Sequence, residues 1–232
     1  MRPSPVLPER YAEPGRQAFY DRVASVISPG AAIVDVGSGR SPAVPVNLRP
    51  RNCRYVGLDI SASELAAAAP GSYDEAVVAD LLAAPVGLSE RFDLAVSWQV
   101  LEHVRSLPDA LDAIHGLLRP GGHFAALLSG RWALFAIANR LIPQQLGIRF
   151  MAATLERDPE TVFPAHYNRA TMDGLTTALR GWTHAEIVPR CRGAGYLSAF
   201  PRLRALYLVY EDWAARGSHP NLATHYLVFA QK

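Results

Sequence analysis

A glycine-rich turn and a single acidic residue stand directly after two short apolar runs, where a ligand could be bound. The run Ala31–Val36 leads into the turn Gly37–Gly39, in which missing side chains let the backbone pass close to a nucleotide-like ligand. Twenty residues beyond this turn, a second apolar run ends at Asp59, whose carboxylate could accept hydrogen bonds from both hydroxyls of a ribose. The alternative is that Asp59 or Ser61 caps the helix that follows.

Histidine and tyrosine side chains are the candidates for proton transfer. His103 follows the apolar run Phe92–Trp98, and His166 and Tyr167 follow a long apolar segment. Imidazole exchanges protons near neutral pH, so either histidine could remove a proton from a bound hydroxyl or ammonium group. The alternatives are that Glu102 and His103 cap or pack against the next helix, and that Tyr167 fills an apolar space.

Composition and charge exclude several classes of protein. Of 232 residues, 50% are apolar and 19% are charged, which predicts one globular domain rather than a disordered chain. The formal net charge of +2 is too small to indicate a nucleic-acid partner. Cys53 and Cys191 form no C-x-x-C pair, and adjacent Glu102 and His103 are too few ligands for an ion. We therefore expect no metal and a reducing, cytoplasmic location.

The apolar segments are too short to cross a membrane. No run reaches about 18 uncharged apolar residues, and the chain begins without an apolar export segment, so neither a transmembrane helix nor secretion is expected. The segment Trp132–Pro143 is nevertheless too apolar for an ordinary surface helix. It could be a lid over an apolar substrate, a dimer contact, or, with its flanking arginines, an interfacial membrane helix.

Short apolar runs alternate with segments that could form helices, and this alternation predicts an α/β fold with a parallel sheet buried on both faces. The expected strands are Ala31–Val36, Arg54–Ile60, Glu75–Asp80, Phe92–Trp98, Gly122–Ser129, Trp182–Pro189 and His225–Gln231. The expected helices are Arg16–Ser28, Ser61–Ala69, a short piece near Leu81–Leu88, Leu107–Leu118, Arg169–Arg180 and Arg202–Arg216.

Breaks in the alternation divide the chain, which we expect to be a single domain over 1–232. The divisions are an N-terminal arm at 1–15, a core at 16–130, an insertion or lid at 131–167, the rest of the core at 168–190 and 223–232, and a second insertion at 191–222. The two insertions should control specificity, because function on a common fold resides in what is added to it.

The order of these motifs resembles the class I S-adenosylmethionine (SAM)-dependent methyltransferases, most closely the small-molecule group that includes the ubiquinone and menaquinone enzymes. The resemblance is strong over about residues 16–130 and looser over 168–232. The segments that carry it are Val34–Gly39, Gly57–Ser61, Ala76–Leu81, Phe92–Val104 and Leu117–Phe124. It implies a Rossmann-like, mostly parallel seven-stranded sheet of order 3-2-1-4-5-7-6 with the last strand antiparallel, helices on both faces, and the insertions forming a cap.

The resemblance also implies a set of cofactor contacts. Asp59 corresponds to the ribose acid, Ile60 to the residue that packs on adenine, and Asp80 to the acid that binds the adenine amino group. The remaining contacts are expected beside the methionine part of SAM, beside adenine, and at the methyl-transfer cleft; they are Asp35, Gly37, Ser38, Gly39, Leu81, Ser97 and Gln99.

Two departures from the family pattern stand out. Arg40 and Ser41 follow the glycine turn where a third small residue is common, so Arg40 is a candidate contact for the carboxylate end of SAM, or else a solvated loop arginine. Prolines at 42, 45 and 50 predict that the usual helix before the second strand is short or distorted.

The expected function is transfer of a methyl group from SAM to an oxygen, nitrogen or carbon of a small, apolar molecule or biosynthetic intermediate. His103, His166 and Tyr167 are the catalytic candidates. The expected partner is this acceptor, with a monomer or homodimer and peripheral membrane contact left open. The alternatives are a non-catalytic SAM-binding module and a membrane-surface methyltransferase acting on a lipid-like acceptor. A NAD-dependent oxidoreductase is disfavoured, because the sequence holds no Tyr-x-x-x-Lys pair.

Overall fold

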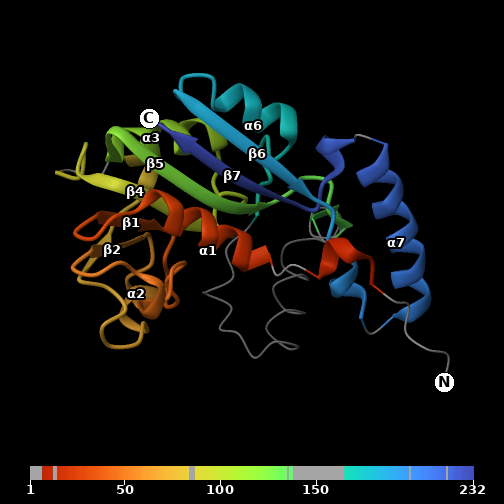
Figure 1. Cartoon of the computed structure of the whole chain (residues 1–232), viewed down its shortest axis with the longest axis horizontal. Helices are drawn as coiled ribbons and strands as arrows, with labels where there is room; N and C mark the ends of the chain where they lie inside the picture. The colour runs from red at the N-terminus through yellow and green to blue at the C-terminus, as the bar shows by residue number, and fades with distance from the viewer. Residues whose placement is uncertain are drawn as a thin grey trace.

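One seven-stranded sheet runs through the molecule (Figure 1). The computed structural model of the chain describes residues 7–12, 15–83, 87–134, 136–137, 165–198, 200–217 and 219–232. The strand order is β3-β2-β1-β4-β5-β7-β6, and β7 is antiparallel to both of its neighbours, while the other neighbouring strands pair in parallel. The predicted fold class and strand order are therefore confirmed.

The strands correspond closely to the apolar runs of the sequence. They are β1 (Ala32–Val36), β2 (Arg54–Asp59), β3 (Glu75–Val78), β4 (Phe92–Trp98), β5 (Leu118–Ser129), β6 (His184–Arg190) and β7 (His225–Gln231). Two predicted boundaries are two residues off, since β3 ends at Val78 and β6 begins at His184. The largest error is in β5, which begins at Leu118 and not at Gly122, because Leu118 already pairs with Phe92 before a register shift. Side chains alternate between faces along each strand, so each buried strand contributes to two cores.

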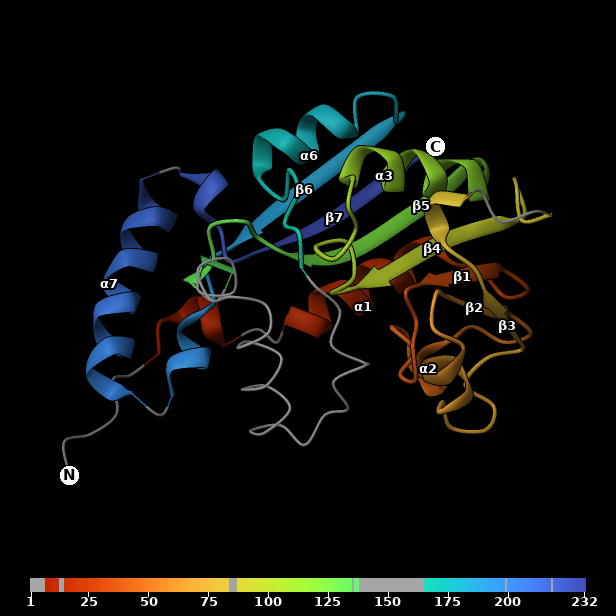
Figure 2. The same ribbon diagram turned by 180° about the vertical axis from the view of Figure 1, so that it is seen from behind.

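Helices cover both faces of the sheet, as Figures 1 and 2 show. On one face, Phe19 and Val23 of α1 pack against Ile33, Leu94 and Val96 of the central strands. On the other face, α3 and α6 pack over the alternate residues of the same strands. The helices are α1 (Gly15–Val26), α2 (Ala62–Ala66), α3 (Leu107–Leu117), α6 (Met172–Ala178) and α7 (Pro201–Arg216).

Several helices are shorter than predicted, and local backbone geometry accounts for one of them. The helix expected over Arg169–Arg180 begins only at Met172, because Arg169 adopts a positive φ of 53° and the side chain of Thr171 caps the helix by accepting from Gly174 N. Much of the predicted lid, residues 138–164, lies outside the described residues, so its role stays a prediction. Within the described ranges, no helix has the length and apolar character needed to span a bilayer.

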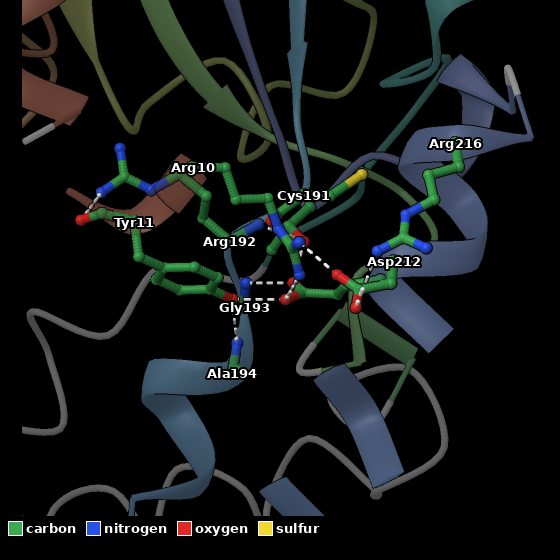
Figure 3. A network of polar contacts seen from close by, with 10 residues as sticks. Arg10, Tyr11, Cys191, Arg192, Gly193, Ala194, Asp212 and Arg216 are labelled. Carbon is green, nitrogen blue, oxygen red and sulfur yellow. Dashed lines mark hydrogen bonds and ion pairs between the residues drawn. The ribbon is translucent and has the colours of Figure 1, made fainter. Parts of the chain in front are cut away.

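The second insertion is fixed to the N-terminal arm by a buried carboxylate (Figure 3). Glu211 of α7 is almost fully buried and accepts hydrogen bonds from Gly193 N, Tyr11 Oη and, at 3.2 Å, Thr224 Oγ1. Arg10 forms ion pairs with Glu211 at 3.5 Å and with Asp212. These contacts join segments about two hundred residues apart in sequence, so they set the position of α7.

Removal of the Glu211 carboxylate should lower stability, because it leaves Gly193 N and Thr224 Oγ1 without their acceptor and takes from Arg10 one of its two ion-pair partners. We expect Glu211→Ala to lower the free energy of unfolding by about 3 kcal/mol, measured by urea denaturation. Glu186→Ala is the matched control, since Glu186 pairs with Arg22 at 2.8 Å on the surface, and it should cost less than about 1 kcal/mol. Similar losses for both variants would contradict a structural role for the network.

Candidate cofactor site

The turn after β1 has a backbone that only glycine fits at its first position. Gly37 has a φ of 71°, and a Cβ there would lie 2.3 Å from Cγ1 of Val100, a distance that real atoms do not adopt. Gly37 N donates to Leu58 O at 2.7 Å, and the hydroxyl of Tyr73 donates to the carbonyl oxygens of Ser38 and Gly39 at 3.1 and 3.0 Å. The turn is therefore held rigidly above the ends of β1 and β2.

Asp59, the predicted ribose acid, lies at the end of β2 beside this turn. Its Oδ2 accepts from Gly39 N at 2.9 Å, and its Oδ1 accepts from Ser61 N at 2.8 Å. Ser61 itself caps α2, because its hydroxyl accepts from Glu64 N at 3.3 Å. Of the two residues that could cap this helix by a side-chain hydrogen bond from Glu64 N, it is Ser61 that does so. Each oxygen of Asp59 keeps acceptor capacity for a further donor, so the ribose role stays a prediction.

Asp35, another predicted cofactor contact, is buried, and its carboxylate accepts hydrogen bonds from other residues of the chain. Its carboxylate is 1% exposed, and its Oδ2 accepts from Ala43 N and from the hydroxyl of Tyr55, both at 2.7 Å. Burial raises the pKa of Asp35 to about 6. The guanidinium of Arg49 stacks on the Tyr55 ring at 3.5 Å and its Nε donates to Val44 O. The carboxylate of Asp35 therefore anchors the segment that follows the glycine turn.

That segment forms only the short 3-10 helix Val46–Leu48, so the predicted distortion of this region is confirmed. Arg40, the candidate for the carboxylate end of SAM, forms a bidentate pair with Glu64, from Nε to Oε2 at 2.8 Å and from Nη2 to Oε1 at 2.5 Å. Contact between Arg40 and a ligand would therefore compete with this pair.

The residues predicted to lie beside adenine occupy two different environments. Ile60 is 59% exposed next to Asp59, and Asp80 is exposed, with its Oδ1 accepting from Leu82 N at 2.9 Å. Leu81, by contrast, is buried in the core beneath α3, and the neighbouring Leu82 is the exposed residue of the pair. The structure thus offers Ile60, Asp80 and Leu82 on the surface of this edge, whereas the Leu81 side chain faces inward.

The end of β4 supplies the two residues predicted at the methyl-transfer cleft. Ser97 is fully buried and its hydroxyl donates to Val36 O at 3.1 Å, which joins β4 to the glycine turn. Gln99 is exposed and adopts a φ of 56°, while its N–H donates to Leu127 O at 2.7 Å. A non-glycine residue with positive φ stores local strain, a feature that is common at functional sites.

The three predicted catalytic residues come together around Glu102. The carbonyl oxygen of Glu102 accepts hydrogen bonds from His166 N and from Tyr167 N, both at 2.9 Å. The backbone of His166 and Tyr167 therefore lies next to that of His103, although more than sixty residues separate them in sequence. His166 is exposed and His103 is half-buried. Tyr167 is 2% exposed within the core, which matches the alternative that it fills an apolar space.

Two buried polar atoms at this edge have no hydrogen-bond partner among the described residues. They are Ser38 Oγ in the glycine turn and Glu102 Oε2, whose sister oxygen Oε1 accepts from Ser129 N at 3.2 Å. An unsatisfied buried polar atom is costly, so such atoms are expected where a ligand or solvent supplies the partner. In the part of the chain that the structure describes, no cluster of three or more His, Cys, Asp or Glu side chains could hold a metal ion.

Three residues that shape this site carry no signal in the sequence. Val100 closes over Gly37, Tyr73 binds both carbonyls of the turn, and Tyr55 carries the hydrogen bond to Asp35. Each acts across two elements, so no local pattern marks it.

A cavity of about 830 Å³ lies away from this cluster, between the end of β6, the N-terminal arm and α7. Its lining includes Arg10, Cys191, Ala214 and His219. At the usual strand spacing, β6 lies about 14 Å from β4. The cavity is therefore on a different part of the sheet from Gln99.

Addition of a methyl group at Gly37 should disturb the turn through contact as well as through backbone strain. Gly30 is the matched control, since it has a φ of 82° but open space around its Cβ position. We expect Gly30→Ala to cost about 1 kcal/mol of unfolding free energy and Gly37→Ala about 1–3 kcal/mol more, in urea denaturation. Val100→Ala added to Gly37→Ala should recover part of the difference. Equal costs for the two glycine variants would contradict the contact.

The buried Asp35 carboxyl should make stability depend on pH. Its folded-state pKa of about 6 lies above its ordinary value of 3.8, so the folded protein binds the proton more tightly. Stability should therefore fall as the pH rises from about 4 to about 6, by up to about 3 kcal/mol relative to Asp35→Asn. Urea denaturation of both proteins across this range measures the difference. A difference that stays constant with pH would exclude the raised pKa.

Comparisons with known proteins agree with this geometry. A family model described as a methyltransferase domain matches residues 9–176. Over 112 residues the chain is 31% identical to a ubiquinone biosynthesis O-methyltransferase of Nitrobacter winogradskyi, a match that covers 47% of this chain and 42% of that protein. The chain thus matches less than half the length of this curated relative.

Two solved structures of SAM-dependent methyltransferases match almost from end to end. The enzyme from Mesorhizobium loti has a TM-score of 0.54 at 23% identity, over 93% of this chain and 96% of that one. The enzyme from Archaeoglobus fulgidus has a TM-score of 0.57 at 14% identity, over 94% and 95%. At these identities the two structures support the fold. With its matched family model and strand order, the chain belongs to the methyltransferase domain family, with the class I fold whose cofactor is SAM.

Proposed function

We propose that this chain transfers a methyl group from SAM to a small acceptor molecule. The observation that carries the proposal is the rigid turn at Gly37, which is clamped by Val100 and lies beside the buried carboxylate of Asp59. When bound, SAM supplies a methyl group on a cationic sulfur. The chain then needs mainly to orient the acceptor and to exclude water.

The residues at the turn fit a ligand of this chemistry. At Gly39 no atom lies closer than 3.7 Å to the position a Cβ would take, so the backbone is open to close approach there, whereas Val100 fills this space at Gly37. Ser38 Oγ is a buried donor without a partner among the described residues. Asp59 retains acceptor capacity for hydroxyl groups, and Ile60 offers an exposed apolar surface next to it. These features support a polar ligand with hydroxyl groups and an apolar ring.

The acceptor is proposed to lie between Gln99 and the turn formed by Glu102 and His103. Glu102 Oε2 is buried and has no partner in the described residues, so it could accept a hydrogen bond from an acceptor hydroxyl or amine. His103 and exposed His166 are the candidates to take the proton released on methylation. The O-methyltransferase relative supports testing hydroxyl acceptors first.

Methyl transfer should be detectable in a mixture of candidate acceptors. We expect incubation with CD3-labelled SAM and an extract of small molecules to yield products in which CD3 replaces hydrogen, measured by mass spectrometry. Calorimetry should show binding of SAM and S-adenosylhomocysteine. Asp59→Asn should weaken SAM binding about tenfold or more, because a charge-assisted hydrogen bond contributes about 1.5–3 kcal/mol.

The exposed Asp112 of α3 gives the matched control for this measurement. Asp112→Asn removes the same charge far from the turn and should bind SAM as the parent does. Binding of NAD without binding of SAM would contradict the proposal outright. Binding of SAM with no labelled product from any extract would support a non-catalytic module instead.

A further inference from the structure

The outer face of α7 is a continuous apolar stripe. It consists of Leu203, Leu206, Val209 and Trp213, preceded by Phe200 at the helix N-terminus, and we call it the α7 stripe. The exposed fractions of the five side chains are 46%, 68%, 66%, 53% and 63% in that order. The spacing of three and four residues places the helical members on one side of the helix. Large apolar side chains gathered in this way mark an interaction surface.

The stripe cannot be turned inward by rotation of the helix. The opposite side of α7 holds Glu211 and packs Tyr207 and Leu208 into a small core with Ala194 and Leu197. The polar network of Figure 3 ties that side to the N-terminal arm. These contacts hold the stripe on the outer side of α7 in the described part of the chain.

An exposed arginine stands at each end of α7. Arg202 is exposed at the start of the helix, and the side chain of Arg216 is 84% exposed at its end. Of the two acids of the helix, Glu211 is buried, whereas Asp212 pairs with Arg10 and, at 3.9 Å, with Arg216, whose side chain stays largely exposed. The stripe is therefore flanked by cations at both ends, a pattern that favours an anionic partner.

A second copy of the chain fits this surface poorly. Two-fold pairing of α7 helices would place Arg202 against Arg216 if they were antiparallel, or against the other Arg202 if they were parallel. Glu211 is buried, and Asp212 already pairs with Arg10 and Arg216 of its own chain, so the two acids of the helix would do little to compensate the added charge. A lipid surface suits both the apolar side chains and the flanking charges. Acyl chains can contact Leu, Val, Phe and Trp, while anionic headgroups can pair with the arginines.

We propose that the α7 stripe binds the surface of anionic lipid membranes. The helix stands where β5 and β6 end, as Figures 1 and 2 show. Ser129 and Arg190, the last residues of these strands, both pair with His225. This is the edge of the sheet that carries the candidate site, so a docked protein would present that edge toward the membrane. The proposal stands apart from the methyl-transfer activity, because lipid binding is measured without it.

The test is flotation of the whole chain with vesicles of phosphatidylcholine containing phosphatidylglycerol, compared with phosphatidylcholine alone. We expect binding to the mixed vesicles that weakens as salt is raised. Leu206→Glu combined with Val209→Glu should lower the partition coefficient about tenfold or more, because the apolar contact is lost. Both side chains are exposed, so the fold should be retained, which circular dichroism checks.

Two control variants separate the stripe from general surface effects. Val46→Glu with Leu48→Glu makes the same change at exposed apolar residues of the 3-10 helix after the glycine turn, and should leave the partition unchanged. Arg202→Gln with Arg216→Gln should weaken binding by about fivefold for each arginine. Arg51→Gln with Arg180→Gln, exposed arginines on other elements, should have less effect.

Three outcomes would overturn the proposal. The first is absence of binding to the anionic vesicles, and the second is equal loss of binding in the stripe variant and its control. The third is a dimer in solution, measured by light scattering without vesicles, that Leu206→Glu converts to a monomer. This last result would assign the stripe to a second copy of the chain.

Discussion

Two buried carboxylates fix the backbone on which the candidate site depends. Asp59 holds the turn from the side of β2 through Gly39 N, and Asp35 holds the segment after the turn through Ala43 N and Tyr55. Carboxylates in apolar surroundings are costly, and these two are tolerated because backbone N–H groups and a hydroxyl satisfy them. The hydrogen bonds that offset the cost of burying Asp35 and Asp59 are the same bonds that hold the glycine turn and the segment after it in position.

Most of the sheet could be predicted from the sequence, because a strand that is buried on both faces is an uninterrupted apolar run. The start of β5 could not, since it depends on the pairing of Leu118 with Phe92, a contact between distant residues. The length of α6 was also missed, because neither the positive φ of Arg169 nor the cap at Thr171 is marked by the apolar pattern. Errors of this kind lie at element boundaries, where long-range contacts decide between competing local preferences.

In the candidate site, too, the residues marked by local sequence patterns could be predicted, and those that act through long-range contacts could not. Asp59 and the glycine turn follow from local spacing, since two parallel strands with the same register end at the same edge. Tyr73 and Val100 had no local signal, because each contacts the turn from another part of the chain. The motif predicts an apolar residue beside adenine but does not decide between Leu81 and Leu82. In the structure Leu81 is buried and its neighbour Leu82 is exposed.

The two ends of the insertion at 131–167 are held together by hydrogen bonds. The insertion that begins after Gly130 leaves and returns at adjacent points, because Arg131 N donates to Ala170 O at 2.8 Å and its guanidinium donates to Tyr167 O at 3.1 Å. Closing a loop between fixed ends costs little extra free energy as the loop lengthens. Changes of loop length between Ala136 and Tyr167 should therefore cost the sheet little, whereas Ala133, Ala136 and Tyr167 themselves belong to its core. Under the proposed function, such length changes would alter the acceptor side of the site while the glycine turn stays in place.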